Sequence, residues 1–389
     1  MDSSGGPPLC FPNLNSSCRR LLRPTSQTVV LYTLLASISL LTVVLNLLVV
    51  VSISHFRQLN TSTNTLLLSL AVSDLLVLNS SCRRLLRPTS QAALLYTLLA
   101  SVSLLTVVLK LLVVVSISHF KQLHTPTNAL LLSLAMSDLL LGFLVMPIEG
   151  LCYIETCWLL GRLMCALSPY LSYCLLSFSL GSMVLISVDR YIAICDPLLY
   201  SSKITVNRVK LSVCVCWACS LLYNGCILMG HIGWPDRFSS CHGECVVFIS
   251  RTSGTVDFFL SFLGPCAVMF VMYMRVFVVA VSQVRAIQSQ AAVRAVPAAK
   301  KSELKAARTL GILIAVFVMC FCPYYYPSLA GVDTFLSLPS YAMVCWIMLI
   351  NACVNPVIYV LFYPWFRRAL RFIVTLRILQ PHSRDVKIL

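Results

Sequence analysis

Four polar residues stand inside long apolar stretches, where their oxygen atoms could hold a small hard cation. Asp138 occurs in LSLAMSDLL, Ser179 lies in a later apolar stretch, and Asn351 and Asn355 belong to NACVNPVIY. A polar group within a membrane helix is costly and therefore indicates a function, and oxygen ligands suit hard cations. We expect a sodium site here; a hydrogen-bond network without an ion is the alternative.

A further acidic residue, Asp257, has no basic neighbour in its apolar segment TVDFFLSFLGP. A lone carboxylate in such a segment needs a cation, so Asp257 could anchor an ammonium group. Tyr324, Tyr325 and Trp346 lie in later stretches and could contact a cation with their ring faces. The alternatives are a carboxylate hydrogen-bonded at a water-filled rim and aromatic residues that only pack in the core.

The triplet Asp189-Arg190-Tyr191 ends another long apolar stretch, and Glu303 opens the stretch that follows a basic loop. Arg190 could pair with Glu303, and the pair could act as a latch, because breaking a buried ion pair is strongly unfavourable. Taken alone, the triplet would fit an ordinary charge cluster at a membrane interface equally well.

The segment Asn15–Leu76 recurs as Asn79–Leu140, and about ten of the 62 positions differ. This single long repeat is typical of a tandem duplication, or of a join of two neighbouring gene copies, and not of a solenoid. One difference places Lys110 where the first copy has Asn46. The lysine could pair with Asp138 and displace the cation, or it could simply destabilise the fold.

Apolar helices must position all of these groups. Of the 389 residues, 59% are hydrophobic and 11% charged, whereas soluble domains carry about 25% charge. We therefore expect an all-α membrane protein: a seven-transmembrane helix bundle with an extra duplicated first helix and an amphipathic helix, Pro364–Ile378, after the seventh span. The expected helices are 29–54, 92–118, 129–151, 166–188, 211–230, 255–281, 309–331 and 340–362.

The repeat also predicts the division of the chain. Residues 1–78 would hold the N-terminal tail, the duplicated first helix and a second helix truncated at the repeat junction. Residues 79–389 would hold the seven-helix core and its tail. The net charge of +16 gathers mostly in the loop near residue 300 and in the tail, which is typical of cytoplasmic segments and does not indicate a nucleic-acid partner.

Seven spans with these cytoplasmic segments put the N-terminus outside the cell. Glycosylation sequons at Asn15 and Asn79 agree with that orientation. The arginines at positions 19, 20 and 23 run against the charge rule. The N-terminal residues do not read as a cleavable signal peptide. We expect a multi-pass protein of the plasma membrane, in contact with the lipid bilayer.

Several motifs occur in an order that is similar to the rhodopsin-like G-protein-coupled receptors. They are SDLL, Cys165, DRY, Trp217, Cys245, Pro265 with Tyr273, Pro323 and NPVIY. The segments CFPNLNSSCRR, CDPLLY and NACVNPVIYVLFYPWFRRAL further resemble a fish trace amine-associated receptor. The resemblance implies a disulfide between Cys165 and Cys245, and another from Cys241 to an N-terminal cysteine. Cys18 and Cys82 compete for Cys241, and we expect Cys82 because it is closer in the chain to the core.

The resemblance also implies a function. The protein would be a receptor for an amine and would act on a stimulatory or olfactory heterotrimeric G protein. Its switch residues would be Asp189, Arg190, Tyr191, Glu303, Tyr273, Asn355, Pro356 and Tyr359. We expect no cofactor beyond an allosteric sodium ion.

Some positions depart from the amine-receptor pattern. Ser172 stands where those receptors usually carry an aspartate, so the resemblance moves the amine contact to Asp257. Ser172 would still face the pocket. Phe321 replaces the tryptophan of the usual CWxP motif, and Leu349 stands where an opsin would need lysine.

Rival functions remain at this stage. They are a non-signalling pseudo-receptor, a rhodopsin-like receptor for a ligand other than an amine, and a transporter, which the parallel terminal repeat disfavours. The sequence contains no His and Cys residues at the spacing of a metal site, and no set of residues typical of a catalytic nucleophile.

Overall fold

The protein folds into long helices in a computed structural model. This structure describes residues 9–19, 88–155, 157–235, 237, 239–247, 249–289, 311–312, 314–326, 347–349, 351–352, 354–355, 358, 364–375, 377–380 and 383–386. Within these ranges five helical segments are long and apolar enough to cross a membrane. The expected helix at 29–54 lies outside the described residues.

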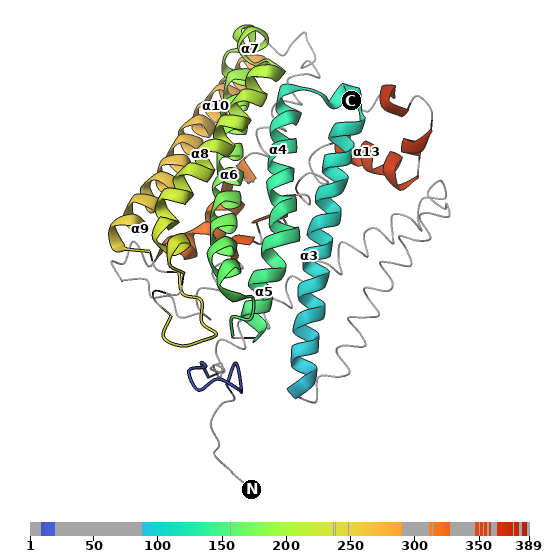
Figure 1. Ribbon diagram of the computed structural model, residues 1–389. Helices are drawn as coiled ribbons and strands as arrows, with labels where there is room; N and C mark the ends of the chain where they lie inside the picture. The colour runs from blue at the N-terminus through green and yellow to red at the C-terminus, as the bar shows by residue number, and fades with distance from the viewer. Residues whose placement is uncertain are drawn as a thin grey trace.

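The five candidate spans pack side by side (Figure 1). They are α3 (Pro88–His119), α4 with η3 and α5 (Pro126–Leu140, Leu141–Val145 and Met146–Glu155), α6 (Gly161–Cys195), α8 (Val206–Gly233), and α9 with η4 and α10 (Arg251–Asp257, Phe258–Leu263 and Gly264–Ser289). A short helix, α7 (Pro197–Lys203), follows α6. A shorter apolar helix covers Ile314–Tyr326.

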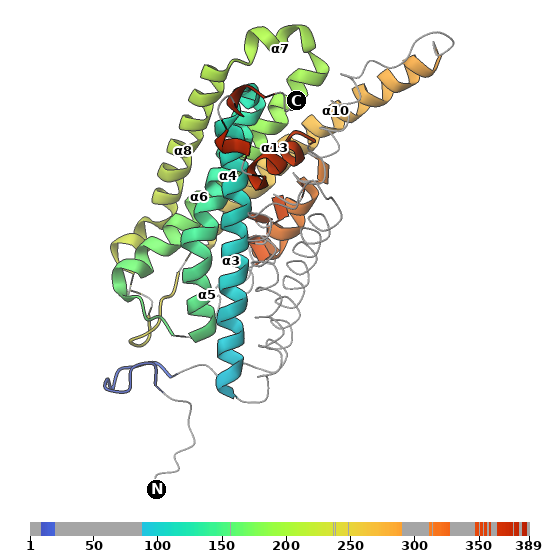
Figure 2. The same cartoon turned by 90° about the vertical axis from the view of Figure 1, so that its right-hand side faces the viewer.

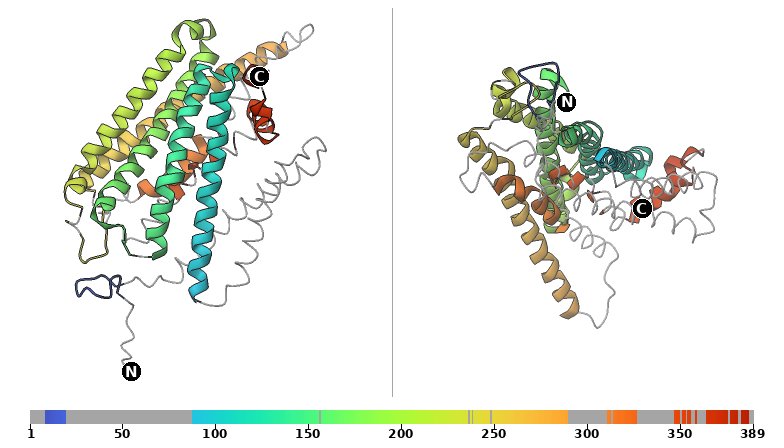
Figure 3. Two further views of the ribbon diagram at one scale, coloured as in Figure 1. Left: turned by 45° about the vertical axis from the view of Figure 1, so that its right-hand side comes forward. Right: turned by 90° about the horizontal axis from the view of Figure 1, so that it is seen from below.

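Helix α6 occupies the middle of the bundle. It packs against α4, α8 and α10, with α8 and α10 on one side and α3 beyond α4 on the other (Figure 3). Its 35 residues would span about 52 Å, which exceeds the roughly 30 Å hydrocarbon core of a bilayer. Helix α10 also extends well past its neighbours (Figure 2).

Local sequence explains where several helices begin. The Thr125 hydroxyl accepts the backbone N–H of Asn128 at 3.3 Å, and Pro126 occupies the first turn of α4. Thr205 caps α8 and Ser250 caps α9 in the same way. Such caps satisfy backbone donors that have no partner within the helix. These three helices therefore begin at residues that the sequence marks.

Two spans contain a wide π-helical turn in place of the continuous helix that periodicity predicts. The turn η3 ends at Val145, two residues before Pro147, and η4 ends at Leu263, two residues before Pro265. Proline has no N–H and its ring clashes with the carbonyl four residues earlier, and one wider turn relieves that clash. The second turn begins directly after Asp257.

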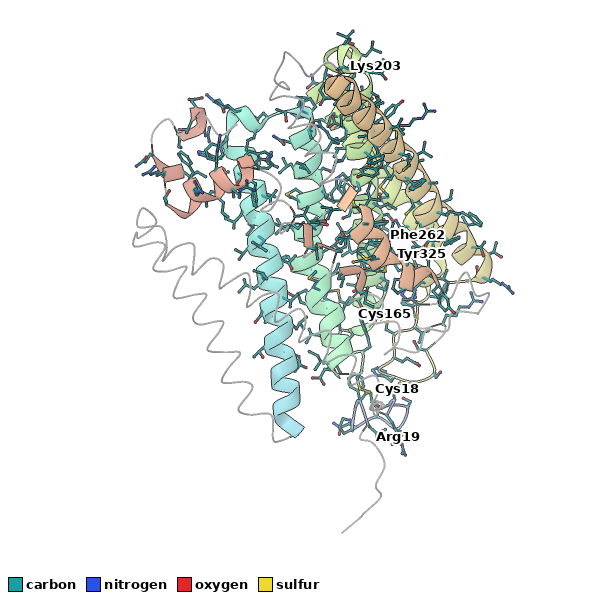
Figure 4. The ribbon with its side chains drawn as sticks, turned by 180° about the vertical axis from the view of Figure 1, so that it is seen from behind. Cys18, Arg19, Cys165, Lys203, Phe262 and Tyr325 are labelled. Atoms are coloured by element: carbon teal, nitrogen blue, oxygen red, sulfur yellow. A yellow bond between two sulfur atoms is a disulfide. The ribbon has the colours of Figure 1, made fainter. Side chains whose placement is uncertain are left out.

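Three disulfides join loops and the first turns of α6 at one end of the bundle, here called the disulfide end. They link Cys165 to Cys245, Cys18 to Cys241, and Cys10 to Cys157. The expected partner of Cys241, Cys82, is therefore wrong, because Cys18 forms that bond. The Cys10–Cys157 bond has no counterpart in the sequence-based expectations. Figure 4 places Cys18 and Cys165 at this end.

The N-terminal loop 9–19 is also held by backbone hydrogen bonds. Cys18 donates its N–H to the carbonyl of His242 at 3.0 Å, and His242 donates to Ser16 at 2.8 Å. Helix α3 starts at the same end, since Tyr96 donates a hydrogen bond to Glu155 at the end of α5. Residues 19 and 88 therefore both lie at the disulfide end (Figure 1).

At the opposite end, α13 (Pro364–Val374) packs on the end of α3. The ring of Phe120 meets Phe372 edge-on at 6.0 Å, and Phe366 is fully buried. Arg367 and Arg368 are exposed on the other face of α13. The structure thus contains a helix with one apolar and one basic face here; that it lies on a membrane surface stays a prediction.

Candidate functional sites

The carboxylate of Asp257 is buried where α9 meets the π-turn η4, with only 5% of the residue exposed. Tyr223 of α8 donates a hydrogen bond to Oδ1 at 2.9 Å, and Tyr325 donates to Oδ2 at 3.4 Å. The side chain of Ser261 also forms a hydrogen bond with this carboxylate, so all three partners are neutral hydroxyl groups. Among the described residues, no basic side chain pairs with this carboxylate.

A narrow cavity of about 20 Å³ adjoins Asp257. Tyr325 stacks on Phe262 with ring centroids 4.8 Å apart, and Figure 4 shows these two labelled side chains next to each other. Tyr324 and Tyr173 share a hydrogen bond. The full lining is Tyr173, Leu176, Ser177, Leu180, Asp257, Ser261, Phe321, Tyr324, Tyr325 and Met348.

Three of the five expected ligand residues therefore line one cavity: Asp257, Tyr324 and Tyr325. Ser172 is buried in α6 but does not line that cavity. Trp346 lies outside the described residues. Tyr223 and Tyr173 were not expected, because a tyrosine within an apolar helix gives no sequence signal that separates core packing from contact with a carboxylate.

A second buried carboxylate, Asp138, gathers the polar residues predicted to hold a cation. Ser179 donates to Oδ1 at 3.1 Å, and Asn355 donates to Oδ2 at 3.0 Å. Asn355 also donates to Asn351 at 3.3 Å. Lys110 of α3 forms an ion pair with Oδ2, with side-chain exposures of 0% for Lys110 and 1% for Asp138.

A third polar cluster lies at the end of α6 remote from the disulfides. Arg190 binds the carboxylate of its neighbour Asp189 at 2.6 Å and also donates to Thr127 of α4. Tyr200 of α7 donates to the other carboxylate oxygen of Asp189 at 2.9 Å. Burial raises the pKa of Tyr200, so its phenol keeps the proton that it donates.

Comparison with known proteins identifies the fold family. The family model of the seven-transmembrane receptors of the rhodopsin family matches residues 110–359. The chain belongs to the rhodopsin family of seven-transmembrane receptors.

Curated relatives resemble this receptor over most of its length. It is 36% identical to trace amine-associated receptor 13c of Danio rerio over 80% of the chain and 94% of the relative. It is 36% identical to trace amine-associated receptor 5 of Rattus norvegicus over 79% of the chain and 92% of the relative. It is 37% identical to trace amine-associated receptor 1 of Mus musculus over 76% and 93%. Receptors of this family are not enzymes.

The remaining switch residues of the receptor are only partly described. The side chain of Tyr273, on α10, packs against Gly311. A Cβ added at Gly311 would lie 2.5 Å from the tyrosine hydroxyl. Glycine at this position therefore permits the close approach. Tyr191 is half-buried next to Arg190, whereas Glu303, Pro356 and Tyr359 lie outside the described residues, so the Arg190–Glu303 latch stays a prediction.

Two groups of side chains at the disulfide end have ligand atoms close enough for a metal ion, but disulfides consume their cysteines. A disulfide sulfur carries no thiolate with which to bind a metal, so neither group is a metal site. The groups are Cys165 with His231 and Cys245, and Cys18 with Cys241 and Glu244.

Proposed function

We propose that this receptor binds an amine and activates a stimulatory heterotrimeric G protein. The observation that carries the proposal is Asp257, a buried carboxylate whose described partners are neutral hydroxyls. A buried anion with such partners gains most from a ligand that brings a positive charge. The relatives are named as trace amine receptors, which supports the same ligand class.

The residues that line the cavity suit a small ligand with one cationic end. Asp257 would bind the ammonium group, while Tyr223 and Tyr325 hold the carboxylate through their hydroxyls. The rings of Phe321 and Tyr324 line the same cavity and would contact the organic part of the amine. A bound amine would widen this narrow space, and the resulting movement of α10 and residues 314–326 is the expected first step of activation.

The ligand shifts the receptor toward its active arrangement only if it binds that arrangement more tightly. In the described structure Arg190 is held by Asp189 and Thr127. We infer that activation frees Arg190 from these partners and from Glu303. The guanidinium would then face a cleft that opens at the end of the bundle remote from the disulfides, where the G protein would bind.

Redox chemistry and charge support an orientation in the plasma membrane with the N-terminus outside the cell. Disulfides persist in oxidising compartments, so the end with three disulfides would face the outside of the cell, with the N-terminal loop. The exposed arginines of α13 lie at the other end, as expected for the cytoplasmic side. An epitope tag at the N-terminus, stained on intact cells, tests this orientation.

A cyclic AMP assay in transfected cells tests the ligand anchor. Asp257→Asn should lower the potency of an activating primary amine about 100-fold or more, because the ammonium loses a desolvated charge partner. Asp385→Asn is the control, since Asp385 is exposed and remote from the cavity. The assay uses several activating amines. If the Asp257→Asn receptor reaches the cell surface in normal amount and every amine keeps its full potency, Asp257 is not the anchor.

A further inference from the structure

The cluster around Asp138 already contains a cation, the ammonium group of Lys110. We propose that Lys110 is the built-in counter-ion of Asp138 and that this receptor holds no sodium ion at that cluster. The oxygen-bearing residues of this cluster predict a sodium site from the sequence, so the inference departs from that expectation. It does not depend on the identity of the activating ligand.

The hydrogen-bond directions argue against a sodium ion beside Asp138. Oδ2 accepts from both Lys110 and Asn355, and Oδ1 accepts from Ser179. A sodium ion needs oxygen lone pairs directed at it. In this arrangement Asn355 and Ser179 instead direct hydrogens at the carboxylate, so both of its oxygens are already engaged by donors.

Charge argues in the same direction. The side chain of Lys110 is fully buried and ends on Asp138, so the pair is close to neutral as a whole. A second cation in this buried cluster would be repelled by the ammonium, and low local polarity strengthens that repulsion. Among the described residues the cluster offers one unpartnered acceptor, Oδ1 of Asn355, which cannot replace the carboxylate as a cation ligand.

The position of Lys110 explains why this one residue decides whether sodium can bind at Asp138. Its Cα lies on α3, which packs along α4, and its long side chain reaches the carboxylate across the helix interface. The corresponding residue of the first repeat copy is Asn46, whose side chain carries no charge. Lys110→Asn should therefore leave Asp138 without a fixed counter-ion and open the cluster to sodium.

Thermal unfolding of the purified full-length receptor in detergent tests this. The midpoint is measured in sodium chloride and in choline chloride at equal ionic strength. The natural chain should unfold at the same temperature in both salts. Lys110→Asn should unfold about 3 °C or more higher in sodium, because a ligand that binds only the folded state stabilises it. The double variant Lys110→Asn/Asp138→Asn should lose the sodium response again.

Each result decides for or against the proposal. A sodium-dependent rise in the natural chain would overturn it. A folded Lys110→Asn variant with no sodium response would also overturn it, because Lys110 would not be what excludes the ion. If Lys110→Asn does not fold, the double variant, which removes both charges, should recover folded receptor. If the double variant also fails to fold and the natural chain responds to sodium, the partner of Asp138 is sodium and not lysine.

Discussion

Asp138 and Asp257, two buried carboxylates of the bundle, differ in what neutralises them. Asp138 pairs with the ammonium of Lys110 and accepts two further hydrogen bonds. Asp257 has a similar degree of burial, but its described partners are the neutral hydroxyls of Tyr223, Tyr325 and Ser261. One negative charge is therefore compensated within the chain, while the other has no cationic partner among the described residues.

This difference separates a structural ion pair from a binding site more clearly than burial alone. Burial disfavours an unpaired charge, so a fold keeps such a charge where a function needs it. Asp138 would then matter chiefly for stability, and Asp257 chiefly for the response to ligand. Making the same substitution at both positions tests the contrast directly.

The largest effect is expected at the internal pair. Asp138→Leu should lower the free energy of unfolding by about 3–5 kcal/mol, because it removes the carboxylate that forms an ion pair with the buried Lys110 ammonium. Adding Lys110→Met should restore most of that loss, since an apolar pair of similar volume is often tolerated. Thermal unfolding in detergent measures both variants. Equal stability of the single and the double variant would show that the two residues are not coupled.

The next effect concerns the hydroxyl that holds Asp257 from α8. Tyr223→Phe should reduce the potency of an activating amine about 10-fold, because a hydrogen bond to a charged group contributes about 1.5–3 kcal/mol. Tyr170→Phe is the matched control. The hydroxyl of Tyr170, on α6, donates to the backbone carbonyl of Leu221, which lies on α8 like Tyr223. A dose–response curve for cyclic AMP measures both. Equal losses in the two variants would argue against a specific role for Tyr223.

Much of the bundle could be predicted from the sequence, because long apolar stretches and capping residues mark the helices. The Asp138 cluster could also be predicted: polar residues within membrane helices must find one another, and the lysine that replaces Asn46 has a carboxylate within reach. The π-turns before Pro147 and Pro265 could not be read from helical periodicity. They follow from a local clash that hydrophobic pattern does not record.

The disulfides were harder to predict for a different physical reason. Proximity in the chain favoured Cys82 over Cys18, but the entropy of closing a loop grows only slowly with its length, by about 0.6 kcal/mol per doubling. The 64-residue repeat therefore hardly affects the choice between the two cysteines. Backbone pairing of loop 9–19 with His242 aligns Cys18, and spacing along the chain does not reveal that pairing.

Substitution of Asp257 should affect the response to ligand more than stability, in contrast to substitution of Asp138. Asp257→Leu should change the free energy of unfolding by less than about 1 kcal/mol, because the loss of its hydrogen bonds to hydroxyl groups is offset by removal of a buried charge without a described counter-ion. The same variant should lose its response to amines. Thermal unfolding alongside Asp138→Leu measures the difference. A loss of stability as large as that of Asp138→Leu would mean that Asp257 has an internal charge partner.

The smallest effect is expected at an exposed ion pair, which sharpens the argument about burial. Lys121 and Asp385 lie 3.0 Å apart at the end of α3, but 64% and 56% of their side chains are exposed. Solvent and salt screen such a pair, so exposed pairs contribute about 0.2–1 kcal/mol. Lys121→Gln should therefore lower the unfolding midpoint only slightly, and the difference should vanish in high salt. The pair of Lys110 and Asp138 combines the same two residue types. If Lys121→Gln lowered stability as much as Asp138→Leu, burial would not set the strength of ion pairs in this receptor.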